Sequence, residues 1–372
     1  MIPACDAAPD HIKAIAAYQP GKPTSELARE LKLDENAIIK LASNENPMGA
    51  SPAAVRAIER VLNGIALYPD GSGFEFKSAL IKKHGVTREQ IVLGNGSNDV
   101  LELAARTFLT ANDSAVFAQH AFAVYPLAVQ AIGATKIEVA AEDYGHDLPA
   151  MAKAVRADTR VVFVANPNNP TGTFVSADTL LAFIEAISES VIVVLDEAYT
   201  EYLPDKLRVD TIAWLRRFPN LVITRTLSKA YGLAGLRVGF ALAHPDVADL
   251  MNRLRQPFNV NSLALAAAEA ALNDDAFLGR SAELNANGLA QLAEGFKRLG
   301  LSYIPAFGNF ISVEVGDGAA MFQFLLKQGI IVRPIAGYGM PRHLRISVGL
   351  PQQNDRFLAA LAEGLKQIAS HR

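Results

Sequence analysis

Short, continuous runs of Val, Ile, Leu and Ala alternate with helix-like segments along most of the chain. The main runs are QIVL (90–93), SAVFA (114–118), RVVFVA (160–165), VIVVL (191–195), LVIT (221–224) and VGFALA (238–243). They lack the alternation of apolar and polar positions that marks a sheet with one solvated face, so both faces of these strands are expected to be buried. The pattern predicts a large α/β domain over residues 46–265, built on a mainly parallel central sheet.

The pattern changes on either side of this region. After residue 265 the strand-like segments GNFISVEV, IIVRPI and HLRISVG are interleaved with longer helix-like segments. This predicts a smaller α+β domain over residues 266–372. Residues 1–45 contain Pro, Gly and one short helical pattern, and we expect them to form an N-terminal arm that is part of the small domain.

Composition narrows the class of protein. The 372 residues are 50% hydrophobic and 20% charged, with a formal net charge of −3, which gives no indication of nucleic acid or an anionic membrane as partner. The lone Cys5 cannot form an internal disulfide, and there is no signal-peptide pattern or long apolar span, so we expect a cytoplasmic protein. The seven histidines are scattered without metal-ligand spacing, and no metal site is expected.

Polar residues follow the ends of four predicted strands. They are the segments GNGSN (94–98), NPNNPTG (166–172), DEAY (196–199) and TLSK (226–229). Because ligands gather at the carboxyl ends of strands in open α/β sheets, these segments are expected to share one site. The first opens a helix and suits a phosphate, although Asp99 excludes a dinucleotide fingerprint and the ending of a P-loop is absent.

Each of these residues also has an ordinary structural explanation. Taken alone, Lys229 would be interpreted as a surface lysine, Asp196 as a cap of the next segment, Tyr199 as a core residue, and Asn169 as part of a turn. Together they offer an amine for an aldehyde, a carboxylate for a ring nitrogen, and a phenol and an amide for a ring oxygen. This set, with a phosphate-binding turn, matches the functional groups of pyridoxal 5′-phosphate (PLP).

The residues of these motifs, and the order of the motifs along the chain, resemble those of a known family. Six segments resemble the motifs of the histidinol-phosphate aminotransferases, which are fold-type I PLP-dependent enzymes. They are LASNENPMG, LYPDGSG, NPNNPTG, VLDEAY, TLSKAYGLAGLRVGF and LRISVG. The resemblance runs from Tyr18 to the last helix, and TLSKAYGLAGLRVG is its most specific part.

The resemblance implies a role for each matching position. Lys229 would bind the cofactor covalently and transfer protons, Asp196 would pair with the pyridinium nitrogen, and Tyr199 and Asn169 would bond the ring oxygen. Phe122 would stack on the ring, where many relatives have tyrosine. The phosphate would be held by Ser97, Asn98, Thr226, Ser228 and Arg237, and by Tyr68 of a neighbouring subunit. Arg345 would hold the anionic group of the substrate, with Tyr18, Asn46 and Arg333 around it.

The implied activity is transamination between histidinol phosphate and 2-oxoglutarate, a step of histidine biosynthesis, by a homodimer with shared active sites. The biosynthetic direction uses imidazole-acetol phosphate and glutamate. Two other readings stay open at this point: an aromatic amino acid aminotransferase, and a phospho-amino-acid decarboxylase. The resemblance also implies a cis peptide bond between Asn169 and Pro170.

Overall fold

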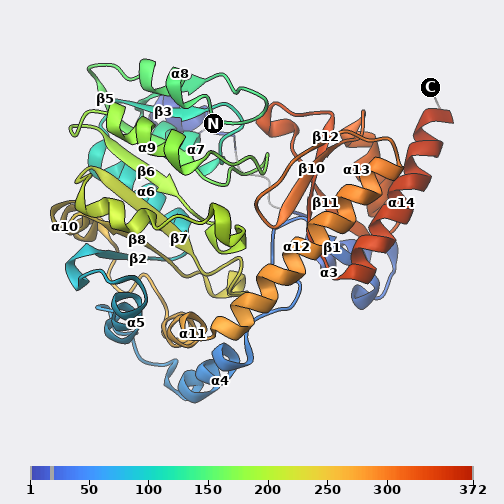
Figure 1. Ribbon diagram of the computed structural model, residues 1–372, viewed down its shortest axis with the longest axis horizontal. Helices are drawn as coiled ribbons and strands as arrows, with labels where there is room; N and C mark the ends of the chain where they lie inside the picture. The colour runs from blue at the N-terminus through green and yellow to red at the C-terminus, as the bar shows by residue number, and fades with distance from the viewer. Residues whose placement is uncertain (1, 17–20, 371–372) are drawn as a thin grey trace.

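The computed structural model describes residues 2–16 and 21–370, which form two β-sheets with helices packed on them (Figure 1). One sheet has seven strands and the other has five. Among the described residues, no helix combines the length and the apolar character that crossing a membrane requires.

The seven-stranded sheet forms the centre of the larger part of the molecule. Its strands lie in the order β2-β8-β7-β6-β5-β3-β4. Strand β8 is antiparallel to β2 and β7, whereas the neighbouring pairs from β7 to β4 are parallel, which confirms the predicted mainly parallel sheet. The bounds are β2 (Ile91–Gly94), β3 (Ser114–Ala118), β4 (Thr135–Val139), β5 (Thr159–Ala165), β6 (Ile192–Asp196), β7 (Leu221–Thr226) and β8 (Gly239–Ala243).

Helices cover both faces of this sheet, which is why its central strands are apolar at every position. Successive residues of β5 point in opposite directions, so Val162 and Val164 join one hydrophobic cluster and Val161 and Phe163 the other. One face packs on α6 (Ser97–Phe108), α7 (Val124–Ile132) and α10 (Pro245–Leu254). The other packs on α4 (Pro52–Val61), α5 (Phe74–His84), α8 (Leu148–Lys153), α9 (Ala177–Ala186) and α11 (Ser262–Leu272).

The five-stranded sheet lies beside the first, on the right in Figure 1, and has the order β1-β11-β12-β10-β9. The pair β1–β11 is parallel and the other pairs are antiparallel. Its strands are β1 (Ile39–Leu41), β9 (Tyr303–Ile304), β10 (Phe310–Glu314), β11 (Ile330–Pro334) and β12 (His343–Ser347), packed with α12 (Asp275–Arg298), α13 (Gly318–Lys327) and α14 (Pro351–Ser370).

The N-terminal segment contains more regular structure than the sequence indicated. Its described residues form α1 (Pro3–Asp6), α2 (Asp10–Lys13), α3 (Thr24–Leu31) and the 3-10 turn η1 (Glu35–Ala37), followed by β1. Strand β1 has only three residues, too few to show a period, yet it pairs with β11 and so joins the small sheet. The expected domain divisions after residues 45 and 265 stay predictions.

Candidate active site

A cavity of about 230 Å³ lies where the carboxyl ends of β5, β6 and β7 face strands β11 and β12 of the small sheet. Twelve of the fifteen residues that the sequence analysis singled out line this one cavity. They are Ser97, Asn98, Phe122, Asn169, Asp196, Tyr199, Thr226, Ser228, Lys229, Arg237, Arg333 and Arg345. The strand-end argument therefore brought together residues that lie up to 132 positions apart in the chain, from Ser97 to Lys229, and the resemblance added Arg345 from the other sheet.

Lys229 lies in the turn that follows β7, and its side chain is mostly buried against the cavity. The ammonium Nζ donates a hydrogen bond to the carbonyl oxygen of Ser43 at 3.0 Å. Burial lowers the pKa of Lys229 to about 7, and the positive charges of Arg345 and Arg237 act in the same direction. A large fraction of this amine is therefore neutral and nucleophilic near neutral pH.

Asp196 is the last residue of β6, and its carboxylate is buried between two hydroxyl groups. Oδ2 accepts a hydrogen bond from the phenol of Tyr125 at 2.8 Å, and Oδ1 accepts one from Thr224 Oγ1 at 3.2 Å. Burial raises the pKa of Asp196, and both hydrogen bonds oppose that rise. A cationic N–H group in the cavity would stabilise the ionised form of this carboxylate.

The two groups assigned to a ring oxygen, Tyr199 and Asn169, both line the cavity, and each has Arg345 nearby. The side-chain amide of Asn44 donates a hydrogen bond to the Tyr199 hydroxyl at 3.0 Å. Burial raises the pKa of Tyr199 to about 12, and nearby Arg345 opposes part of this rise. Arg345 Nη1 donates to Asn169 Oδ1, so the asparagine keeps its amide hydrogens for other acceptors.

An anion cradle forms where β2 leads into α6. Gly96 precedes the helix with φ +80°, and a Cβ at Gly96 would lie 2.5 Å from Arg237 Nη2. A Cβ at Gly239 would lie 2.6 Å from the backbone nitrogen of Ser97, so both positions require glycine. Arg237 Nη1 also donates to Ser228 Oγ at 3.3 Å. A helix N-terminus with a guanidinium and hydroxyls beside it is a setting that suits phosphate.

This donor set fits PLP. The cavity offers a neutral amine for the aldehyde, a buried carboxylate for the ring nitrogen, a phenol and an amide for the ring oxygen, and the cradle for the phosphate. Phe122 also lines the cavity, where its ring meets Tyr125 edge to face, with centroids 5.9 Å apart.

Arg345 and Arg333 present cationic groups from adjacent strands of the small sheet, where they are register partners in the β11–β12 pair. Arg345 is 6% exposed, and its Nη2 donates to the carbonyl oxygen of Ala42 at 2.7 Å.

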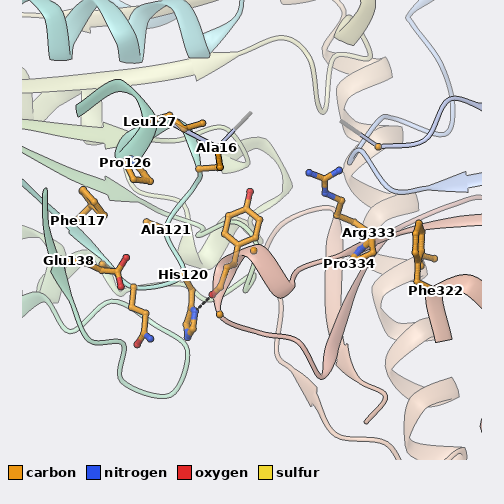
Figure 2. Close-up of a pocket in the computed structure, with 18 of the residues that line it drawn as sticks. Ala16, Phe117, His120, Ala121, Pro126, Leu127, Glu138, Phe322, Arg333 and Pro334 are labelled. Carbon is orange, nitrogen blue, oxygen red and sulfur yellow. Dashed lines mark hydrogen bonds between the residues drawn. The ribbon is translucent and has the colours of Figure 1, made fainter. Parts of the chain in front are cut away.

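A second cavity, of about 740 Å³, also has Arg333 in its wall (Figure 2). Arg333 and Pro334 form one side of it, and Pro126 and Leu127 lie on the other.

Comparison with known proteins agrees with this geometry. Residues 36–361 match the family model described as aminotransferase class I and II. Histidinol-phosphate aminotransferase 2 of Nitrosospira multiformis is 61% identical over 97% of this chain and 93% of that protein. Histidinol-phosphate aminotransferase 1 of Thiobacillus denitrificans is 60% identical over 96% of this chain and 93% of that protein.

The chain belongs to the histidinol-phosphate aminotransferase family. A crystal structure of a member from Sinorhizobium meliloti, in complex with pyridoxal-5′-phosphate, superimposes with a TM-score of 0.88. It is 28% identical, and the match covers 97% of this chain and 98% of that one. The predicted family and fold are confirmed, and the chain is a PLP-dependent aminotransferase of fold-type I.

Two described residues of the predicted site, Asn46 and Tyr68, do not line the aminotransferase cavity. Tyr18 lies outside the described residues. Asn46 instead donates hydrogen bonds to the carbonyl oxygen of Ala230 at 2.9 Å and to Ser281 Oγ at 2.8 Å, so it braces the turn that carries Lys229. Tyr68 is 84% exposed and stacks on Phe258, with centroids 4.8 Å apart.

Sequence reasoning also missed residues that shape the site. Asn44 belongs to the same LASNENPMG motif as Asn46, yet it is Asn44 that lines the cavity and bonds Tyr199. Tyr125 lies within an apolar helix pattern, which gave no indication that its hydroxyl meets a carboxylate. The predicted cis bond at Asn169-Pro170 is confirmed, and Asn166-Pro167 is cis as well.

Proposed function

We propose that this aminotransferase exchanges an amino group between histidinol phosphate and 2-oxoglutarate. In histidine biosynthesis it would run from imidazole-acetol phosphate and glutamate. The observation that carries the proposal is a mostly buried lysine, Lys229, sharing one cavity with the cradle and with Arg345 and Arg333. The names of the relatives at 60–61% identity support the substrate, and neither the aromatic aminotransferase nor the decarboxylase reading is favoured.

The residues of the cavity have different roles in the proposed reaction. PLP, when bound, supplies an electron-withdrawing ring that stabilises negative charge on the substrate carbon. In our proposal Lys229 would hold the cofactor, and its free amine would carry a proton as general base and general acid. Its pKa near 7 suits both roles at neutral pH. Asp196 would keep the ring nitrogen protonated, while Tyr199 and Asn169 would orient the ring oxygen.

The remaining polar residues would hold the two phosphates and the substrate carboxylate. The cradle for the cofactor phosphate consists of Ser97, Asn98, Thr226, Ser228 and Arg237. Phe122 limits the position of the ring. We assign Arg345 to the anionic group of each substrate, because its planar guanidinium suits both carboxylate and phosphate. Arg333, on the neighbouring strand, would add a second contact to the phosphate of histidinol phosphate.

We further propose a homodimer in which Tyr68 contributes to the partner's cradle. Tyr68 lies in a surface region of large, exposed hydrophobic side chains, which a soluble monomer seldom leaves uncovered. Leu62, Ile65, Leu67 and Phe74 of the same segment, 62–74, are also exposed, and so is Phe258, on which Tyr68 stacks. The roles of Tyr18 and Asn46 around the substrate and a cytoplasmic location stay predictions.

The assay that tests this function offers the purified protein glutamate with imidazole-acetol phosphate or with phenylpyruvate, and a separate reaction offers a phospho-amino acid and measures carbon dioxide release. We expect rapid amino transfer to imidazole-acetol phosphate. Faster transfer to phenylpyruvate would establish the aromatic aminotransferase instead, and carbon dioxide release would establish the decarboxylase. Borohydride reduction with PLP should fix the cofactor on one peptide, and recovery on a peptide without Lys229 would reject the lysine assignment.

A further inference from the structure

Tyr125 is a buried phenol that the proposed mechanism does not use. It is the second residue of α7, and its side chain is fully buried. Its ring stacks on Phe163 with centroids 4.8 Å apart and an interplanar angle of 8°, and meets Phe122 edge to face. Two aromatic contacts and the helix therefore fix where its hydroxyl points.

That hydroxyl points at Asp196. The phenol donates to Oδ2 at 2.8 Å, the shorter of the two hydroxyl contacts to this carboxylate, since Thr224 donates to Oδ1 at 3.2 Å. Burial and the neighbouring carboxylate raise the pKa of Tyr125 well above its usual range. The phenol is therefore protonated, and it is the donor of this hydrogen bond at any pH the enzyme meets.

We propose that Tyr125 is a positioning residue that keeps the carboxylate of Asp196 ionised and directed at the ring nitrogen of PLP. The inference rests on the proposed pairing of Asp196 with that nitrogen. A buried carboxylate without donors takes up a proton, and a neutral carboxyl group no longer stabilises a pyridinium. A hydrogen bond from Tyr125 to the ionised form opposes this, so it acts on the cofactor only through the charge of Asp196.

Tyr125→Phe is a narrow test, because it removes one oxygen and keeps the ring that stacks on Phe163. Apoprotein is titrated with PLP and with 1-deazapyridoxal 5′-phosphate, which keeps the aldehyde, phenol and phosphate but lacks the ring nitrogen. Hydrogen bonds to charged groups predict that the Kd for PLP rises about tenfold or more, whereas the Kd for the deaza compound changes by less than about twofold.

A double-mutant cycle identifies the partner. In an Asp196→Asn background, Tyr125→Phe should change the Kd for PLP by less than about twofold, because the charge through which it acts is absent. Thr224→Val removes the longer hydrogen bond and should give a smaller loss that is also selective for PLP. Tyr202→Phe, at another buried tyrosine, is the matched control and should leave both Kd values unchanged.

If Tyr125→Phe weakened the binding of both ligands equally, or weakened the binding of PLP equally with and without the Asp196 charge, Tyr125 would only support the core. Thermal unfolding of each apoprotein identifies variants that fail to fold, and Thr224→Val then carries the test alone. If the unmodified protein itself binds both ligands equally and Asp196→Asn changes neither, the proposed pairing of Asp196 is wrong. That result is distinct from a failure of Tyr125, and none of these titrations depends on the substrate.

Discussion

Replacing Lys229 by methionine in the cofactor-free protein should change how stability depends on pH. The pKa of Lys229 is about 7 in the folded protein, below the ordinary lysine value of 10.5. Between these two values the unfolded chain holds a proton that the folded protein has released, so wild-type stability rises with pH. Below pH 7 both states are protonated, and the folded protein carries the full cost of a buried ammonium.

The size of this change in stability follows from the shift in the pKa of Lys229. A difference of about 3.5 pKa units corresponds to roughly 5 kcal/mol as an upper limit. Part of the side chain faces the cavity, where water screens the charge, so about 2–4 kcal/mol is the better figure. Lys229→Met also loses the hydrogen bond to Ser43, which offsets about 1 kcal/mol at every pH. The variant should thus be the more stable protein at pH 6.

The assay is urea unfolding of both apoproteins from pH 6 to 9.5, analysed as the difference in their free energies of unfolding. The difference cancels the titrating groups that the substitution does not affect, and between pH 8 and 9.5 it should shrink by up to about 1.4 kcal/mol per pH unit. Lys153→Met, at an exposed lysine of α8, controls for the exchange of lysine for methionine. A difference that stays flat from pH 6 to 9.5 would refute the lowered pKa and with it the neutral amine.

Three further outcomes can be checked separately. Arg333→Ala should lower kcat/KM about 10- to 100-fold for histidinol phosphate and much less for phenylalanine, and equal losses in steady-state assays would remove its phosphate role. In the wild-type protein Arg225, whose side chain is 13% exposed, bonds Glu197 through two nitrogens at 3.0 and 2.7 Å; Glu197→Gln removes this bonded counter-charge, so thermal or urea unfolding should show a loss of about 3 kcal/mol. Mixing Tyr68→Phe with Lys229→Ala subunits should create heterodimers with one site carrying neither change; activity no higher than that of the separate variants would contradict shared sites.

Much of the site could be predicted because one topological rule gathers it. Asp196 ends β6, Asn169 follows β5, and Lys229 follows β7, three parallel strands that are adjacent in the sheet. Continuous apolar runs locate such strands in the sequence, and the rule that ligands lie at their carboxyl ends then places these side chains together. Arg345 lies beyond this rule, because it comes from a different sheet, and only the resemblance of LRISVG indicated it.

What the sequence did not reveal depends on contacts between segments with no local signal. Strand β1 has three residues, and only pairing with β11, almost 300 residues later, identifies it as a strand. Asn44 and Asn46 are both asparagines of one motif, and which of them faces Tyr199 is decided by how β1 enters the small sheet. A single sequence records the residue types at such positions but not the direction in which each side chain points.

The two ionisable groups at the centre of the cavity show what burial does for this chemistry. Burial raises the pKa of Asp196 and lowers that of Lys229, so desolvation moves both groups toward their neutral forms. Neutrality is useful for Lys229, which must act as a nucleophile, but it is harmful for Asp196, whose proposed partner is a cation. The structure treats them differently: Asp196 receives hydroxyl donors from Tyr125 and Thr224, whereas Lys229 has cationic Arg345 and Arg237 nearby. The two hydroxyl donors therefore oppose the effect of burial at Asp196, whereas the two guanidinium groups add to it at Lys229, and in each case these neighbours shift the pKa in the direction that the proposed role requires.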